Sequence, residues 1–516
     1  MPPKRRTLLQ LAIAAWHTRL GTARTAEYAA PPQTLPQDRI PFSHKIAYGL
    51  GAFVNNLLAA AVGGMIIILN LGLGMNPALV GIVGALPRAA DAIMDPVMGY
   101  ISDTTRSRWG RRRPYIFIGA ILSGITYAIL WMLPDGRSET FYFWYFLVCS
   151  VVFYGAYTVF AAPWVALGYE LTPDYHERTR LMGVQNFIGQ IAYLISPWFL
   201  WIMNQKDWFA TPKAGAAGLA IAIGIVSVVV GIIPAIVLRE RFSHAEPAAT
   251  ERPPVPVESG WAAMKRNAVT FIKGCGTTLR SRPYLKLCAA TFLVFNGFIM
   301  ISSFQSYVII YYVFGGNQEL GSKFAGYAGT LGAVSTFLVI FFITWLATRI
   351  GKRKAFFVST GLSIVGYLVK WFCYNPRYPW LVLLPTPLLA FGLGGLFTLM
   401  GSMIADVVDA DELETRERRE GMFGSIYWWV VKVGMAAALA AGGFLLNATG
   451  FDVALGGAQS ERTMLLMRLC DVFVPAVTSA LAIWAIWTYP ISEAKARETR
   501  DALEARRGTP GAPLPA

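Results

Sequence analysis

Hydrophobic residues run along this chain in long, nearly unbroken stretches that short polar segments separate. A helix needs about 20 apolar residues to cross the hydrocarbon core of a bilayer, and runs of this length satisfy their backbone in lipid as helices. The pattern therefore predicts an all-α membrane protein with twelve transmembrane helices. The predicted spans are residues 46–72, 77–102, 114–134, 141–168, 181–204, 215–238, 287–314, 325–348, 355–374, 380–405, 421–447 and 464–488.

Lys and Arg residues gather in every second connection between these spans. If both termini are cytoplasmic, 35 of the 45 Lys and Arg residues lie on that side, six lie in outer loops and four lie within spans. Because positively charged loops stay cytoplasmic, this distribution predicts a multi-pass protein of the cell inner (plasma) membrane with both termini inside. The net charge of +15 then orients the protein in the lipid bilayer, and we expect no nucleic-acid partner.

The composition agrees with a lipid environment. Only 15% of the residues are charged and 55% are hydrophobic, whereas soluble domains carry about 25% charged residues. The five cysteines show no C-x-x-C spacing, and the four histidines lie outside the long apolar runs. We therefore expect no structural metal site and no cofactor, and we expect a monomer.

A basic pattern, R-x-G-[RK]-R-[RK], occurs after the second span and again after the eighth, 241 residues later. Such a repeat across a linker indicates two parallel six-helix halves with pseudo-symmetry, as in transporters of the major facilitator fold. We assign six residues of these two segments to cytoplasmic gate loops: Arg108, Gly110, Arg112, Arg349, Gly351 and Arg353. The predicted organisation is a cytoplasmic extension at 1–43, the first half at 44–238, a linker with an interfacial helix at 239–285, the second half at 286–490 and a cytoplasmic tail at 491–516.

Charged residues within the spans indicate where the chemistry takes place, because an ionisable group at membrane depth costs about 2.5–3.5 kcal/mol. Arg88, Asp91 and Asp95 are spaced to share one face of the second span. Two carboxylates one turn apart repel each other, so they attract a proton or a small cation such as Na⁺. Lys432 in span eleven offers an ammonium that can pair with them across the centre.

Three further charges lie towards the outer ends of spans nine and twelve. We expect Lys370 to extend its ammonium to the membrane surface. We expect Arg468 and Asp471, which are three residues apart, to pair with each other.

The segment Arg88-x-x-Asp91-x-x-x-Asp95-Pro96-x-x-Gly99 resembles the second span of the glycoside–pentoside–hexuronide cation symporters, the family of melibiose permease. The likeness continues through the following basic loop and runs from about residue 44 to residue 490. This resemblance implies a cation site at Asp91 and Asp95, with Thr158 matching the family's threonine ligand in span four and Lys432 its lysine in span eleven.

Several positions differ from that family. Met94 replaces an asparagine cation ligand and has no hard oxygen, which favours H⁺ over Na⁺ as the coupling ion. Asn56 and Ala161 replace the sugar-holding aspartates, and Asn186 replaces an arginine, so the galactoside pocket is not retained.

Other polar and aromatic residues could still bind a sugar, which needs amide hydrogen bonds and an aromatic platform. Taken one at a time, each is explained as well by hydrogen bonding between helices. The candidate substrate-binding set is Asn55, Asn56, Tyr157, Trp164, Asn186, Gln190, Gln305 and Trp428.

The resulting hypothesis is a secondary active transporter, a cation (H⁺ or Na⁺) symporter of a sugar or glycoside that works by alternating access. One alternative keeps the fold and carries a lysolipid or another amphiphilic solute. A second alternative is an intramembrane prenyltransferase, since Asp91/Asp95 and Asp406/Asp409 imitate its paired aspartate motifs. The twelve spans and the repeat argue against the enzyme.

Overall fold

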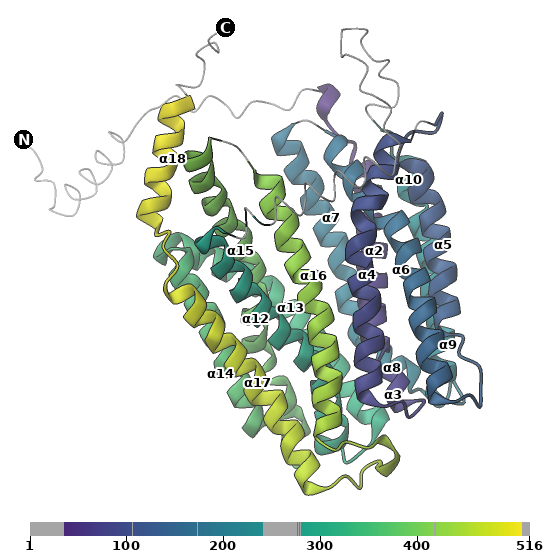
Figure 1. Ribbon diagram of the computed structural model, residues 1–516. Coiled ribbons are helices and arrows are strands. Elements are labelled where there is room, and N and C mark those ends of the chain that lie inside the picture. Colours follow the sequence, from purple (N-terminus) through teal and green to yellow (C-terminus); the bar gives the residue numbers. More distant parts are fainter. Residues whose placement is uncertain are drawn as a thin grey trace, which may run out of the picture.

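A computed structural model describes residues 36–240 except 106 and 173, residues 276, 278 and 280–416, and residues 419–507. Within these ranges the chain forms helices joined by turns and short loops. Figure 1 shows two groups of helices side by side, with α16 along their boundary. The predicted extension at 1–43 lies outside the described residues as far as residue 35, and so does most of the predicted linker, including its interfacial helix.

The first half begins with a 3₁₀ turn, η1, and continues through six long helical segments. Several helices begin with a proline in the first turn, where the missing N–H costs nothing, and with a polar residue that caps free N–H groups, such as Asn76 and Asp174. The elements are η1 (Pro36–Asp38), α2 (Phe42–Met65), α3 (Ile68–Leu71), α4 (Pro77–Thr104), α5 (Arg113–Trp131), α6 (Glu139–Glu170), α7 (Tyr175–Ile195), η2 (Ser196–Trp198), α8 (Phe199–Met203), α9 (Pro212–Gly231) and α10 (Ile233–Val237).

The second half repeats this plan and ends in a polar helix. The elements are α12 (Arg282–Tyr307), the π-helical turn η3 (Val308–Val313), α13 (Gln318–Ile350), α14 (Lys352–Cys373), η4 (Pro379–Leu383), α15 (Thr386–Thr415), α16 (Glu420–Ala448), η5 (Val453–Leu455), α17 (Glu461–Trp487) and α18 (Glu493–Arg507). The last of these lies in the predicted tail and packs against α15.

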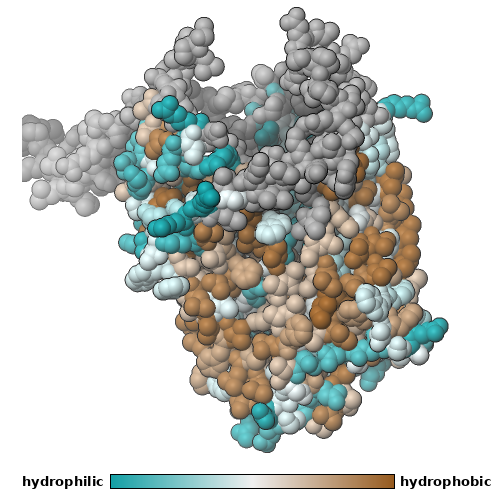
Figure 2. All heavy atoms as spheres, viewed as in Figure 1, coloured by the Kyte–Doolittle hydropathy of each residue, from teal (hydrophilic) through white to brown (hydrophobic). Residues whose placement is uncertain are grey.

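Eleven helical stretches of the described residues are long and apolar enough to cross a membrane. Helix α4, with 28 residues and three charges in its middle, completes a set of twelve, and each predicted span overlaps one of them. Figure 2 shows the corresponding surface, a hydrophobic band across the middle of the molecule with hydrophilic residues towards both ends. The prediction of twelve transmembrane helices is therefore confirmed.

The two halves contact each other mainly through α4 and α16 and through α13 against the end of α7. The backbones of α4 and α16 touch, because a Cβ atom on Gly443 would lie 2.3 Å from the Pro77 carbonyl oxygen and 2.8 Å from the Gly81 Cα. Hydrogen bonds also join the halves here, from Asn76 to Asn447 at 3.1 Å and from Tyr307 to Asn70 at 2.9 Å. These contacts lie at the end of the bundle away from the basic loops.

Candidate functional site

The centre of the bundle holds a group of charges from both halves. Helix α4 presents Asp91 and Asp95, and the close packing of α4 on α16 brings Lys432 against them. The Lys432 ammonium donates to Asp91 Oδ2 at 3.1 Å and to Asp95 Oδ2. The structure therefore joins, across the two halves, three of the four central charges that the sequence singles out.

The two carboxylates differ in their surroundings. Asp91 is 2% exposed, and its second oxygen accepts a hydrogen bond from the Thr158 hydroxyl at 2.9 Å. Asp95 is 42% exposed and forms an ion pair with Lys432. Asp91 thus accepts hydrogen bonds on both oxygens, from α6 and α16, while Asp95 is the more exposed carboxylate.

Arg88 lies one turn from Asp91 on the same helix but makes different contacts. Its guanidinium lies 4.8 Å from the ring centre of Tyr154 and donates to the Ala59 carbonyl oxygen at 3.4 Å. The two oxygens of Asp91 accept hydrogen bonds from Thr158 and Lys432. Arg88 therefore lies next to the ion pair of Asp91 and Lys432 but is not part of it.

The candidate substrate residues of the first half are partly bonded to one another. The Tyr157 hydroxyl donates to Asn55 Oδ1 at 2.8 Å, Asn55 donates to Asn56 Oδ1 at 3.3 Å, and Asn56 donates to the Gly189 carbonyl oxygen at 3.1 Å. This series of hydrogen bonds connects α6, α2 and α7 next to the central charges. Trp164 is not part of it, because this side chain is buried in the core, where its indole N–H donates to the Tyr48 carbonyl oxygen.

The remaining candidates come from α7 and from the second half. Asn186 is exposed, and Gln190 and Gln305 are half-buried. Trp428, one turn before Lys432, is 58% exposed and stacks on Phe397 of α15. The candidate set therefore includes exposed or half-buried amides from both halves and an exposed aromatic stack in the second half.

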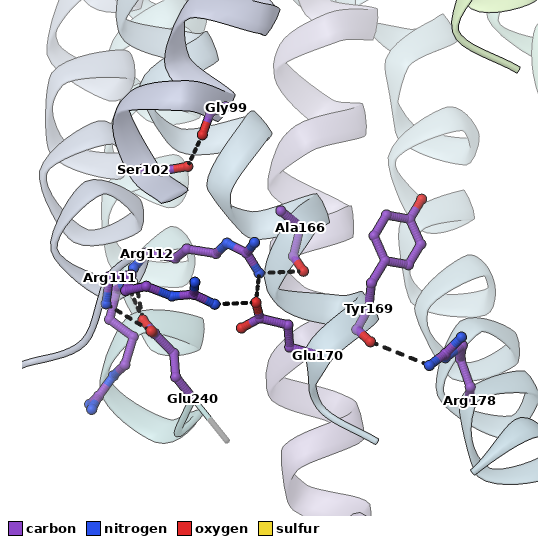
Figure 3. A network of polar contacts seen from close by, with 10 residues as sticks. Gly99, Ser102, Arg111, Arg112, Ala166, Tyr169, Glu170, Arg178 and Glu240 are labelled. Carbon is purple, nitrogen blue, oxygen red and sulfur yellow. Dashed lines mark hydrogen bonds and ion pairs between the residues drawn. The ribbon is translucent and has the colours of Figure 1, made fainter. Parts of the chain in front are cut away.

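The first basic loop is held within its own half by two glutamates (Figure 3). Glu240 accepts hydrogen bonds from the backbone N–H groups of Arg111, Arg112 and Arg113 at 2.7–3.0 Å, and so caps the start of α5. The Glu170 carboxylate, at the end of α6, forms ion pairs with the guanidinium groups of Arg111 and Arg112. Gly110 has φ = +109°, and a Cβ there would lie 2.4 Å from the Glu240 carboxylate, so the position requires glycine. Arg108 is exposed.

The second basic loop makes corresponding contacts in its own half. Lys352 binds Asp406 of α15 at 2.7 Å, and Arg353 donates to the carbonyl oxygens of Trp487, the last residue of α17, and of Tyr489 just beyond it. Gly351 has φ = +82°, and Arg349 lies over the Trp345 ring. In each half one basic side chain pairs with an acidic residue of the fourth long helix, and another, Arg113 or Arg353, donates to carbonyl oxygens at the end of the sixth.

Sequence reasoning was wrong about the outer charges of the second half. Lys370 does not reach the surface: it is fully buried and lies 2.7 Å from Asp471, which is 1% exposed. Arg468 does not pair with Asp471 but lies between the rings of Tyr312 and Trp371 at 4.2 and 4.3 Å. Sequence reasoning also missed Glu170 and Glu240, and the one available signal was that both directly follow a predicted span.

The comparisons with known proteins point to transporters. The isoprimeverose transporter of Lactiplantibacillus pentosus is 24% identical, over 91% of this chain and 93% of that protein. The sodium-dependent lysophosphatidylcholine symporter 1 of Gallus gallus is 23% identical, over 92% and 91%. The crystal structure of a D-xylose–proton symporter shares the fold, with a TM-score of 0.59 at 14% identity over 88% of this chain and 99% of that chain.

The family described as MFS/sugar transport protein matches residues 47–493, which is most of the chain. The homologous relatives and the structural neighbours are transporters, so the prenyltransferase alternative is excluded. The chain therefore belongs to the MFS/sugar transport protein family, as a multi-pass membrane transporter of the glycoside–pentoside–hexuronide type.

Proposed function

We propose that this transporter is a cation-coupled symporter that carries a sugar or glycoside by alternating access. The observation that supports the proposal best is the bridge that Lys432 makes between the halves to Asp91 and Asp95. Two carboxylates share one ammonium there, so an incoming H⁺ or Na⁺ competes with Lys432 for the same oxygens.

Such competition links ion binding to movement. In a low-dielectric environment the attraction between ammonium and carboxylates is strong, and it holds α16 against α4. An ion that neutralises Asp95 weakens this attraction and lets the two halves separate at a lower cost. Asp95 is the better entry point because it is 42% exposed and Asp91 only 2%.

The choice of ion and the orientation are part of the same proposal. Met94, between the aspartates, has no oxygen to offer a metal ion, which favours H⁺. The positive-inside distribution supports cytoplasmic basic loops, and we propose the plasma membrane as the location. The contacts between the halves, at Asn76–Asn447 and Tyr307–Asn70, then correspond to a carrier closed on its outer side.

The test is gradient-driven uptake in vesicles that contain the purified protein. Asp95→Asn should abolish accumulation of solute against its gradient while leaving downhill exchange and folding intact. Asp135→Asn is a matched control, because this aspartate also pairs with a lysine, Lys213, but lies in a loop. Undiminished uphill transport by Asp95→Asn would overturn the proposal.

A second candidate cargo is a lysolipid or a similar amphiphile. The exposed stack of Trp428 on Phe397 supports it, because an apolar chain gains from contact with such a surface. Labelled glycosides and lysolipids, offered under separate pH and Na⁺ gradients, decide between the two cargoes and the two ions. Trp428→Ala should reduce lysolipid uptake more than sugar uptake if the amphiphile is the cargo.

A further inference from the structure

The end of α17 carries two cations that contact the same short stretch of backbone. The Lys286 ammonium of α12 donates to the carbonyl and hydroxyl oxygens of Thr488 at 2.5 and 2.8 Å. The Arg353 guanidinium of α14 donates to the carbonyl oxygens of Trp487 and Tyr489. Three consecutive carbonyl groups thus hold an ammonium and a guanidinium close together, where the negative end of the helix dipole attracts both.

These two cations belong to a larger group, the α17 basic cluster, which consists of Arg282, Lys286, Arg353 and Lys354. Arg282 lies one turn before Lys286 on α12, and Lys354 directly follows Arg353. The side chains of Arg282 and Lys354 are exposed. Within the described residues no carboxylate lies at ion-pair distance from any of the four. Such an excess of positive charge at a membrane surface attracts anionic headgroups.

The acidic residues around this cluster have other partners. Asp406 pairs with Lys352 at 2.7 Å. Glu493 lies beside Gly351, where a Cβ would be 3.2 Å from its Oε2, but its carboxylate pairs with Arg497 on α18. The described residues around the α17 basic cluster therefore leave its charge unbalanced.

The corresponding contact in the first half is balanced by the protein itself. Arg113 donates to two carbonyl oxygens of α10, as Arg353 does at the end of α17. Glu240 lies three residues after α10, accepts the Arg113 backbone N–H at 3.0 Å and attracts the Arg113 guanidinium. The described part of the second half has no such carboxylate at this contact, so an external anion can take its place.

An apolar strip of α17 runs from the basic cluster along the face of the second half that Figure 1 shows. Its exposed side chains recur at intervals of three and four residues, so they share one side of the helix. This α17 strip consists of Phe473, Val477, Ala480, Leu481, Trp484 and Trp487. Trp484 is 74% exposed and Trp487 is 61% exposed. Tryptophan is typical of the boundary between acyl chains and headgroups, so this end of the strip lies at headgroup level.

We propose that the α17 basic cluster and the α17 strip together bind one anionic phospholipid. Its phosphate lies between Lys286 and Arg353, and its acyl chains lie along α17. An ammonium has three N–H donors and a guanidinium five, and two of each donate to the protein, which leaves one and three for the phosphate. Because α12 and α14 both pack on α17, the bound lipid connects three helices of the second half.

The test is lipid binding to the purified full-length protein in detergent, measured by native mass spectrometry. Phosphatidylglycerol is compared with phosphatidylcholine of the same acyl chains. The wild-type protein should bind one phosphatidylglycerol about 25-fold more tightly, from about fivefold for each of two cations at the phosphate. Glycerol 3-phosphate, which has the phosphate without the chains, should not displace the lipid. Displacement by it at equal concentration would indicate a site for soluble phosphates and overturn the proposal.

Variants assign the preference to the α17 basic cluster. Lys286→Gln/Arg353→Gln should abolish the preference, and Lys286→Arg/Arg353→Lys, which keeps both charges, should retain it. Lys354→Gln removes an exposed cation without touching the end of α17, and it should weaken phosphatidylglycerol binding about fivefold. Arg113→Gln is the matched control: it removes the same kind of contact where Glu240 balances the charge, so the preference should persist.

Three results overturn the lipid site. The first is equal binding of the two lipids by the wild-type protein, which does not depend on whether any variant folds. The second is a preference that survives in Lys286→Gln/Arg353→Gln. The third is an equal loss in Arg113→Gln, which would attribute the preference to surface charge in general. The assay contains no solute and no ion gradient, so its outcome leaves the proposed symport unaffected.

Discussion

The ammonium of Lys370 and the carboxylate of Asp471 lie 2.7 Å apart, and both side chains are buried between α14 and α17. This pair lies outside the central charge group, within the second half alone. Breaking a buried pair by removing one partner costs about 3–5 kcal/mol, whereas replacing both with apolar residues is often neutral. The pair therefore holds α14 against α17 and is not part of the proposed coupling site.

Lys370→Met should accordingly destabilise the protein by about 3–5 kcal/mol, because Asp471 would stay buried without its partner. The double variant Lys370→Met/Asp471→Leu should recover most of the loss. Thermal unfolding of the purified protein in detergent measures both. Equal unfolding temperatures for the single and double variants would contradict this interpretation of the pair.

The first basic loop gives a test of backbone geometry. Gly110→Ala places a Cβ at φ = +109° and 2.4 Å from the Glu240 carboxylate, so it strains the backbone and displaces the cap of α5. We expect a loss of about 1–3 kcal/mol, seen as a lower unfolding temperature and faster proteolysis of the loop. Gly136→Ala is the control, since its φ is +64° but a Cβ there meets no atom within 4 Å. The loss of stability in Gly136→Ala should be smaller, because it comes from backbone strain alone.

Much of the fold follows from local patterns in the sequence. Twelve apolar stretches of sufficient length predict twelve helices, because lipid leaves the backbone no other partner. The spacing of Asp91 and Asp95 puts them on one face of α4, and opposite charge makes Lys432 their natural partner. These inferences need only the period of a helix and the cost of charge in lipid.

Other features depend on packing that no local pattern specifies. Lys370 and Asp471 are 101 residues apart, and their pairing depends on how α14 lies against α17. Trp164 lies on α6, which is apolar on every side. Hydrophobic periodicity therefore cannot predict whether the Trp164 side chain faces the core or the centre of the bundle. Glu240 accepts hydrogen bonds from backbone N–H groups of a distant loop. Almost every residue type has such a group, so the sequence does not predict this contact.

Glu177 links the starts of α2 and α7 and predicts a pH dependence. Burial opposes ionisation of this carboxyl, but hydrogen bonds from Lys45, the Ile40 N–H and Arg180 outweigh it and lower the pKa of Glu177 below its usual 4.5. A lowered pKa contributes stability above pH 4.5, and this contribution is lost as the pH falls through the folded-state pKa.

Glu177→Gln should therefore lower the unfolding temperature at pH 7, by an amount equivalent to about 1–3 kcal/mol. The difference from the wild-type protein should shrink as the pH is lowered below 4.5. Glu498→Gln is a suitable control because that carboxylate is 70% exposed and pairs only with Lys495 among the described residues, so its loss should be small. A difference that is constant with pH would show that Glu177 acts through packing instead of charge.

The glycine contact between α4 and α16 gives a test of the alternating movement. Gly443→Ala inserts a methyl group 2.3 Å from the Pro77 carbonyl oxygen, at the end where the halves meet. The closed arrangement of this end is then disfavoured, so the equilibrium shifts towards the arrangement in which the end is open. Transport should slow, and a cysteine introduced at Thr330, which accepts the indole N–H of Trp198 from the other half, should react faster with a water-soluble maleimide.

Gly424→Ala is the control on the same helix. A Cβ at Gly424 meets no atom within 4 Å, so this substitution should leave the rates of transport and of labelling near those of the wild-type protein. If Gly443→Ala slows transport without changing the labelling rate, the two halves do not separate at this contact during the cycle.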